Sequence, residues 1–337
     1  MKIAMFVGAI ALAVTAPVSA QVVLNTSSWM PHSHVLVAGI TIPLCDDIKS
    51  ATQGRVRCNL LPKPVVAAPQ TFDAVRDGVA DLSFIVDGYT PGRFLLSKVA
   101  EFPFLGDTAE VTSVAYQRVY DKYFAKQNEH AGVKVLGVFT HGPGQLFTAT
   151  RQIRSLDDLS GLKIRTGGGL VNDVIKSIGG TGMLKAAPEV YELMSSGIID
   201  GFVFPKETAN SLKLIPTFKY VTDVPGGLYN VSFSMIANPA KWNQISPDDQ
   251  KAIQKLLGEP LARRAGRAWD AADAKGVEAM RTAGIVMSTA PQAMVEEIRK
   301  RTAHLEAQWA ESLKVRGVDG IAALTELRRE IQGQQIK

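Results

Sequence analysis

Residues 155–169 read SLDDLSGLKIRTGGG and combine a polar turn, the short apolar strand LKIR at 162–165 and a run of three glycines. Arginine at a strand end places a guanidinium at the edge of a sheet, and glycine leaves the backbone beside it open. Such a place suits an anion, because a guanidinium and free backbone N–H groups both attract negative charge. The alternative is an ordinary surface arginine before a loop.

Helix and strand patterns alternate on both sides of this stretch. Helix patterns occupy residues 35–52, 69–80 and 108–132. Strand patterns occupy residues 22–29, 55–61, 81–86, 134–139, 162–165, 201–204 and 231–238. This alternation predicts an α/β fold with largely parallel sheets covered on both faces. The length of 337 residues favours two lobes over one.

Two segments share one design, FDAVRDGVADLSFIV at 72–86 and YELMSSGIIDGFVF at 191–204. In each, a helical pattern stops at a glycine, an aspartate follows (Asp81 or Asp200), and an apolar strand begins. Glycine closes a helix in the left-handed conformation, so both segments predict a helix-to-strand unit. The repetition favours two similar lobes. Chance similarity is the alternative, because glycine is common at helix ends.

The last third of the chain is helical in pattern. Residues 246–249, SPDD, predict a helix start with serine as the N-cap and proline in the first turn. The pattern continues to about Gly284, and we expect Pro260 to kink the helix. A helix of this length exceeds one lobe, so we expect it to lie across both. Two further amphipathic helices, at 291–317 and 320–334, close the chain.

The first twenty residues, MKIAMFVGAIALAVTAPVSA, contain one lysine, an apolar run and small residues at their end. This pattern is typical of a secretory signal peptide cleaved after Ala20, so we expect a soluble protein exported to the periplasm. Later in the chain, no stretch reaches the roughly 20 apolar residues that a membrane span needs.

The chain has two cysteines, Cys45 and Cys58. In an oxidising compartment two cysteines predict one disulfide. Two buried thiols are the alternative, because spacing along the chain does not give their distance in space.

The charge pattern bears on the partner. Lys and Arg number 37 against 32 Asp and Glu, a net charge of +5 without a dense basic block. Such a pattern predicts no nucleic-acid partner and slightly favours a small anion.

The sequence lacks the common signatures of catalysis. HExxH, CxxC and GxSxG are absent, and the glycine run at 167–169 lacks the lysine of a phosphate-binding loop. His32 and His34 form an H-x-H pair that could ligate a metal, but no third ligand stands at a useful spacing, so loop histidines are favoured. We therefore expect no metal and no cofactor, and we favour a binding protein over an enzyme.

From about Gly142 to Leu228 the chain resembles the extracytoplasmic solute-binding proteins of tripartite ATP-independent periplasmic (TRAP) transporters, the DctP-like family. The segments that carry the resemblance are SLDDLSGLKIRT (155–166), PEVYELMSSGIIDG (188–201), FP (204–205) and LKLIPTFKYVTDV (212–224). Weaker matches, such as SSWMPHSH at 27–34, extend it over nearly all of the chain after residue 20.

The resemblance implies a two-lobed fold with a long helix spanning both lobes and a ligand in the cleft between them. It implies hinges near Gly142–Pro143 and Leu228–Tyr229. The lobes would comprise residues 21–142 plus 229–268 and residues 143–228 plus 269–337. The protein would bind an organic acid and deliver it to the membrane permease subunits, and we expect it to be a monomer.

In the family, the arginine that ends the GLKIR strand pairs with the ligand carboxylate, and here it is Arg165. Its planar fork suits both carboxylate oxygens, and the glycines after it, Gly168 among them, let backbone amides approach an anion. Many relatives carry a second arginine where this chain has Gln145, and many read DGQENP where this chain reads DGFVFP at 200–205. The loss of these polar groups predicts a monocarboxylate with an apolar or aromatic body, and Gln145 would read a neutral polar group.

Further candidates for the cleft wall are Phe204, Tyr89, Trp29 and His34, all at strand ends or the turns after them. For the aromatic residues the alternative is ordinary core packing. A C4-dicarboxylate receptor would need another cation in the cleft, such as Arg93 or Lys185. An exported α/β hydrolase acting on an anionic substrate is the alternative from another class, and a sensor subunit would look the same in sequence.

Overall fold

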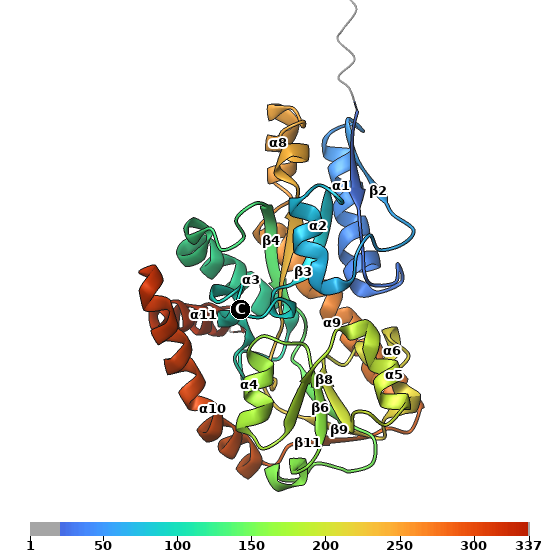
Figure 1. Ribbon diagram of the computed structural model, residues 1–337, viewed down its shortest axis with the longest axis vertical. Helices are drawn as coiled ribbons and strands as arrows, with labels where there is room; N and C mark the ends of the chain where they lie inside the picture. Colours follow the sequence, from blue (N-terminus) through green and yellow to red (C-terminus); the bar gives the residue numbers. More distant parts are fainter. Residues whose placement is uncertain (1–20, 336–337) are drawn as a thin grey trace, which may run out of the picture.

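The computed structural model describes residues 21–335, and the predicted signal peptide at 1–20 lies outside this range. Its strands form two sheets, one in each half of the molecule (Figure 1). The first sheet has the strand order β2 (Val56–Leu60), β1 (Val22–Thr26), β3 (Leu82–Val86), β10 (Ser232–Ala237), β4 (Lys134–Thr140). The second has the order β11 (Val286–Thr289), β9 (Tyr220–Asp223), β5 (Gln145–Thr148), β8 (Gly201–Phe204), β6 (Lys163–Thr166), β7 (Thr181–Leu184). The predicted two-lobed α/β fold is confirmed.

Each sheet is parallel apart from one strand. β10 runs antiparallel to β3 and β4, and β5 runs antiparallel to β8 and β9. Each reversed strand is the first that the chain forms after it leaves the other sheet, since β5 follows β4 and β10 follows β9. We call residues 141–144 and 224–231, which make these passages, the crossing segments. They are bonded to each other, because Gly144 N donates to Tyr229 O at 2.8 Å and Leu228 N donates to Gly144 O at 2.9 Å.

Helices cover the sheets and fill the space beside them. They are α1 (Ile42–Ala51), α2 (Thr71–Arg76), α3 (Ala109–Val119), α4 (Leu170–Ser177), α5 (Val190–Ser195), α6 (Thr208–Ser211), α7 (Pro239–Trp242), α8 (Pro247–Gln254), α9 (Glu259–Thr282), α10 (Gln292–Leu313) and α11 (Gly320–Gln335). α1 is preceded by a π-helical turn at Leu36–Thr41, and α3 is continued by one at Tyr120–Phe124. Within residues 21–335, no helix combines the length and the apolar composition that a membrane span requires.

The two helix-to-strand units of the sequence analysis, α2–β3 and α5–β8, are built alike. Asp81 N donates to Asn25 O at 2.8 Å, and Asp81 Oδ2 accepts a hydrogen bond from Asn25 N at 2.8 Å. Asp200 makes the same two bonds to Lys163, both at 2.8 Å. Each aspartate therefore ties its own strand to the neighbouring strand of the sheet, β1 or β6. The similarity of the two segments is structural and not a coincidence of composition.

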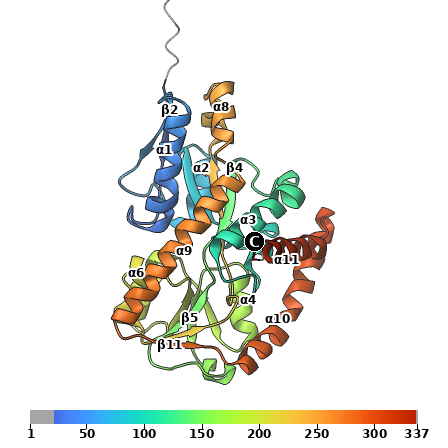
Figure 2. The same cartoon turned by 180° about the vertical axis from the view of Figure 1, so that it is seen from behind.

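The expected kink at Pro260 is wrong, because the chain forms two helices there. Gly258 has φ 64°, in the left-handed region, and separates α8 from α9. Pro260 lies in the first turn of α9, where a missing N–H costs no intrahelical hydrogen bond. The 24 residues of α9 rise about 36 Å. That length lets α9 pack on α3 and β4 of the first half and on α6 of the second, as Figure 2 shows from behind.

α10 also contacts both halves. It packs on α4, while Trp309 Nε1 donates to Leu95 O at 2.7 Å and its ring lies 5.5 Å from the ring of Phe102. α11 then packs on α3. The lobe boundaries given above stay a prediction.

Several short strands of the second sheet have no counterpart in the sequence analysis. β5, β7, β9 and β11 are each four residues long. β7 and β11 form the two edges of the sheet and are partly exposed, so neither has a continuous apolar run. β5 is buried, but it begins with Gln145, whose polar side chain shortens the apolar pattern.

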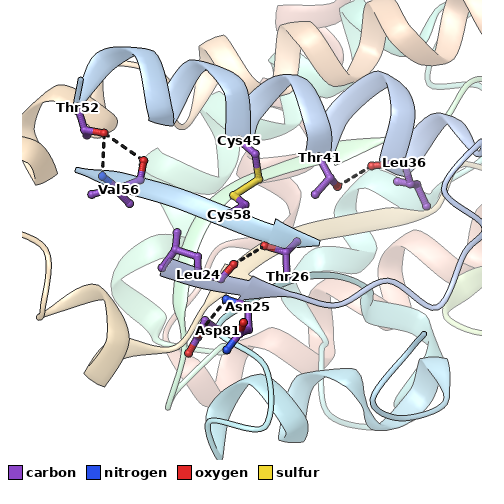
Figure 3. Close-up of a disulfide and its surroundings, with 10 residues drawn as sticks. All are labelled: Leu24, Asn25, Thr26, Leu36, Thr41, Cys45, Thr52, Val56, Cys58 and Asp81. Atoms are coloured by element: carbon purple, nitrogen blue, oxygen red, sulfur yellow. Dashed lines mark hydrogen bonds between the residues drawn. A yellow bond between two sulfur atoms is a disulfide. The ribbon is translucent and has the colours of Figure 1, made fainter. Parts of the chain in front are cut away.

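Cys45 and Cys58 form a disulfide between α1 and β2, with their Cα atoms 5.6 Å apart (Figure 3). β2 is an edge strand of the first sheet, so this bond attaches the edge to the helix that lies over it. In the turn between α1 and β2, Thr52 Oγ1 accepts a hydrogen bond from Val56 N at 3.1 Å and donates one to Val56 O at 3.2 Å.

Candidate ligand-binding site

One cavity is lined by residues of both halves. The lining residues at or just beyond strand ends are Trp29 after β1, Tyr89 after β3, Arg165 in β6 and Phe204 in β8. β1 is parallel to β3 and β6 is parallel to β8, so within each sheet these residues meet at one edge.

Arg165 is 1% exposed, and its guanidinium bonds neutral oxygen atoms. Nε donates to Lys185 O at 2.8 Å, Nη1 to Val203 O at 3.4 Å and Nη2 to Tyr89 Oη at 3.4 Å. The guanidinium carbon lies 4.0 Å from the centroid of the Phe204 ring. The side chain is therefore held in one orientation by backbone carbonyls and an aromatic face.

No carboxylate of residues 21–335 lies within ion-pair distance of this guanidinium. The two cations named as possible second anchors are used elsewhere. Arg93 pairs with Asp73 at 3.0 Å, and Lys185 Nζ lies 3.6 Å from Glu189. Neither lines the cavity. A buried charge without an ionic partner is costly, so this guanidinium is able to pair with an anionic group in the cavity.

Tyr89 joins the two halves at the cavity. Its Oη accepts a hydrogen bond from Ala187 N at 2.9 Å, in addition to the one from Arg165. Both bonds leave the phenolic hydrogen free to donate. The Trp29 ring packs 5.7 Å from the Tyr89 ring, and the Trp29 N–H donates to Phe84 O at 3.2 Å. Trp29 therefore presents an apolar face to the cavity.

His34 lines the cavity and faces a buried carboxylate. His34 Nε2 lies 3.2 Å from Glu207 Oε1, within ion-pair distance, yet the two atoms are not aligned for a hydrogen bond. His34 Nδ1 accepts a bond from Leu36 N at 3.2 Å, so the proton stands on Nε2. His32 is exposed and lies 3.2 Å from Leu61 O. The H-x-H pair does not converge, and residues 21–335 contain no cluster of three His, Cys, Asp or Glu side chains placed to hold a metal ion.

Gln145 and Gly168, two of the predicted site residues, lie outside the cavity wall. The Gln145 amide is used within the protein, because Oε1 accepts from Val224 N at 2.6 Å and Nε2 donates to Val224 O at 3.3 Å. Gly168 has φ 76°, and a Cβ there would stand 2.2 Å from Gly88 O. Glycine is therefore needed at 168 because the backbone of Gly88 packs directly against it. The glycine that lines the cavity together with Arg165 is Gly167.

The lining residues that the sequence analysis missed include His141, Tyr229 and Trp269. His141 and Tyr229 stand on the crossing segments, and Tyr229 Oη donates to Val203 O at 2.9 Å. Their place beside the predicted hinges was the available signal. Trp269 lies in the middle of α9. The one sequence signal for it was the expectation that this helix spans both lobes and so passes the cavity.

Burial sets the protonation of two groups near the crossing segments. It lowers the pKa of His141 to about 4, and the positive charge of Arg165 adds to this shift. It raises the pKa of Asp273 on α9 to about 8, and the nearby Glu207 carboxylate adds to that. At neutral pH the His141 ring is therefore uncharged and Asp273 holds a proton, so neither offers an ionic partner to Arg165.

Residues 27–312 match the family model of the bacterial extracellular solute-binding proteins, family 7 (DctP). The chain belongs to this family. The match includes every strand of the two sheets except β1 and every cavity residue named above, and it confirms the resemblance to the solute receptors of TRAP transporters. The family is one of extracytoplasmic solute-binding proteins.

Solved structures of TRAP solute-binding proteins are similar over nearly their whole length. One from Bordetella bronchiseptica, with bound (R)-mandelate and (S)-mandelate, is 43% identical with a TM-score of 0.91, covering 93% of this chain and 99% of that one. One from an unidentified marine microbe, specific for aromatic acid ligands and crystallised with 3-hydroxybenzoate, is 32% identical with a TM-score of 0.87, covering 94% and 99%.

Among curated family relatives, the outer membrane transporter protein TsaT of Comamonas testosteroni is 30% identical over 318 residues, 93% of this chain and 94% of its own length.

Proposed function

We propose that this TRAP receptor binds an aromatic monocarboxylate in the cavity, with the carboxylate on Arg165, and delivers it in the periplasm to the permease subunits without chemical change. The observation that carries the proposal is the buried Arg165 guanidinium, which has no carboxylate partner within residues 21–335 and lies at the wall of the cavity. A ligand carboxylate would receive a planar, oriented fork of donors. The monomeric state stays part of the proposal.

The charge of the wall favours one carboxylate over two. Arg165 is the only permanent cation among the described residues that line the cavity. His141 is neutral at pH 7 because burial lowers its pKa to about 4, and His34 faces Glu207. A second ionised carboxylate would be buried in the cavity without a partner, which costs several kcal/mol.

The rest of the wall favours an aromatic body. Phe204 lies over the guanidinium, and Trp29, Tyr89 and Phe233 provide further rings. Aromatic pairs prefer tilted or offset contacts, which rings at several angles around a cavity allow. The two solved relatives described above hold mandelate and 3-hydroxybenzoate, both aromatic monocarboxylates.

A hydrolase receives little support from the described residues. Ser234, His130 and Asp87 form a buried cluster, with Ser234 Oγ 3.1 Å from both Asp87 Oδ1 and His130 Nε2. In a catalytic triad the imidazole uses one nitrogen for serine and the other for the acid. Here Nε2 faces both partners, Nδ1 has none, and none of the three lines the cavity. The cluster is a core network.

The test is a binding comparison on protein that has been unfolded and refolded to remove any ligand acquired during expression. Melting temperature and calorimetry would be measured with benzoate, (R)-mandelate, (S)-mandelate and phenylpyruvate against succinate and malate. We expect at least one aromatic acid to raise the melting temperature by mass action and to bind about 100-fold tighter than either C4-dicarboxylate. Preference for succinate or malate would overturn the ligand class. Conversion of the bound acid, followed by mass spectrometry, would overturn the receptor role.

A further inference from the structure

Three residues of the cavity wall, His34, His141 and Trp269, each have a buried ring nitrogen without a hydrogen-bond partner within residues 21–335. The His34 nitrogen lies 3.2 Å from Glu207 Oε1, which leaves the other two without any polar partner. His141 Nε2 and Trp269 Nε1 are buried, and neither has a hydrogen-bond partner within residues 21–335. Both residues line the cavity, and their ring centroids are 5.8 Å apart. Buried polar atoms are nearly always bonded, so an unpartnered pair in a cavity wall points to a group that enters with the ligand.

The two atoms have opposite roles. His141 Nδ1 lies 2.5 Å from Gly142 O, and a carbonyl oxygen only accepts, so Nδ1 carries the proton and Nε2 offers a lone pair. Burial lowers the pKa of His141 to about 4, which keeps this tautomer neutral at pH 7. The indole Nε1–H of Trp269 only donates. The wall therefore presents one acceptor and one donor.

A hydroxyl group matches this pair, because it donates one hydrogen bond and accepts others. A carboxylate would accept from Trp269 but would face the lone pair of His141. An ammonium would donate to His141 but could not accept from Trp269. An apolar substituent would leave both atoms unsatisfied.

The pair is linked to the carboxylate anchor through Tyr229. Arg165 Nη1 and Tyr229 Oη both donate to Val203 O, and the Tyr229 ring lies 5.3 Å from the His141 ring. Tyr229 thus contacts both the carbonyl that holds Arg165 and the His141 ring, and the His141 ring also packs on Trp269. The neighbouring His34, whose ring is 5.8 Å from Trp269, has its Nε2 atom 3.2 Å from Glu207 Oε1.

We propose that His141 and Trp269 form a second binding site for the ligand, where both ring nitrogens hydrogen-bond a hydroxyl group. The cavity would then bind hydroxylated aromatic monocarboxylates more tightly than the same acids without the hydroxyl, the parent acids. The proposal rests on the proposed function, which supplies the carboxylate on Arg165. His141 and Trp269 are specificity residues that touch the ligand and leave its carboxylate to Arg165.

The test uses pairs of acids that differ by one hydroxyl: 3-hydroxybenzoate and 4-hydroxybenzoate against benzoate, and mandelate against phenylacetate. Calorimetry on the wild type is expected to show about tenfold tighter binding of the hydroxylated acid in at least one pair. In His141→Phe and in Trp269→Phe this preference should shrink to about threefold or less, through weaker binding of the hydroxylated acid alone. The parent acid, which needs neither atom, reports that the site is folded. His32→Phe makes the same replacement on an exposed loop and should keep the preference.

Equal affinity for both members of every pair in the wild type would overturn the proposal. So would a preference that survives both substitutions. If one variant no longer binds the parent acid, the other decides, because each removes one of the two atoms. If no acid of any pair binds the wild type, the proposed function itself fails, which is a different outcome from binding without preference.

Discussion

Glu101 Oε2 accepts a hydrogen bond of 2.7 Å from the backbone N–H of Leu170, the first residue of α4. Glu101 Oε1 accepts another from Ser232 Oγ at 2.6 Å, at the start of β10. Ser232 belongs to the first sheet, whereas α4 packs on β6 and β7 of the second. A single buried carboxylate therefore joins the two halves of the receptor.

This link predicts an effect of Glu101 on ligand affinity. If the halves close around the ligand and the bond from Leu170 to Glu101 forms on closure, Glu101→Ala removes a bond of the ligand-bound form, and we expect about tenfold weaker binding by calorimetry. Small-angle scattering should show the radius of gyration of the wild type falling on saturation with ligand, with the variant needing more ligand for the same change. Glu129→Ala is the matched control, because Glu129 is another buried carboxylate on backbone N–H groups, those of Leu95 and Leu96. Equal affinity in Glu101→Ala and the wild type would contradict the prediction.

Arg165 predicts opposite effects on binding and on stability. Arg165→Met should weaken binding of an aromatic acid by about 2–5 kcal/mol, because the ligand carboxylate would be buried without its partner. The unliganded variant should melt at or above the temperature of the wild type, since a buried cation without an ionic partner is removed. Arg165→Lys should bind weakly as well, because a point charge does not reproduce the fork. Arg93→Ala removes a partly exposed arginine outside the cavity wall and is the control for binding. Wild-type affinity in Arg165→Met would refute the anchor.

The disulfide predicts a loss of stability without a loss of function. Replacing Cys45 and Cys58 together by alanine opens a loop with a sequence separation of 13, which should cost about 3 kcal/mol of unfolding free energy in urea. The bond lies at an edge strand and no cysteine lines the cavity, so the dissociation constant should stay the same. Mass spectrometry of unreduced periplasmic protein would show the bond directly, and two freely alkylated thiols would count against it.

Asp273 predicts a decline in stability at alkaline pH. Burial raises its pKa from 3.8 to about 8, so the folded chain holds a proton that the unfolded chain has released over this range. Stability from this group is therefore complete below about pH 4 and falls as the pH rises to about 8. Burial also raises the pKa of Glu101 to about 7, so its contribution to stability falls with rising pH as well, but this fall ends near pH 7. The pKa of His141 is lowered to about 4, so His141 changes the stability only at acidic pH.

The measurement is the melting temperature at pH 7 and at pH 8.5. Asp273→Asn mimics the protonated carboxyl and should show a smaller fall than the wild type over this interval. Asp248→Asn, at an exposed position on α8, should behave like the wild type. An equal fall in Asp273→Asn and the wild type would show that Asp273 is already ionised at pH 7.

Local patterns were sufficient for much of the fold. The helix start at Ser246 is present, with Ser246 Oγ accepting from Asp249 N at 3.2 Å, because an N-cap depends on residues three apart. The helix-to-strand units before β3 and β8 follow from a glycine and an aspartate within a few residues. Pro260 was misjudged because proline has two roles, helix breaker and first-turn residue, and the conformation of Gly258 chose between them. Short edge strands such as β7 and β11 carry too weak a pattern to be found.

The amino-acid sequence by itself determined the α/β class, the family and the place of Arg165 at a strand end, because these depend on periodicity and on motifs within short segments. Only the tertiary structure decided what surrounds that arginine. Gln145 was expected at the ligand, but its amide is used by Val224 on the far crossing segment. His141 and Trp269 entered the wall because two crossing segments and one long helix pack together there. Such contacts join residues far apart in the chain, and they are set by how the sheets pack and not by the preferences of neighbouring residues.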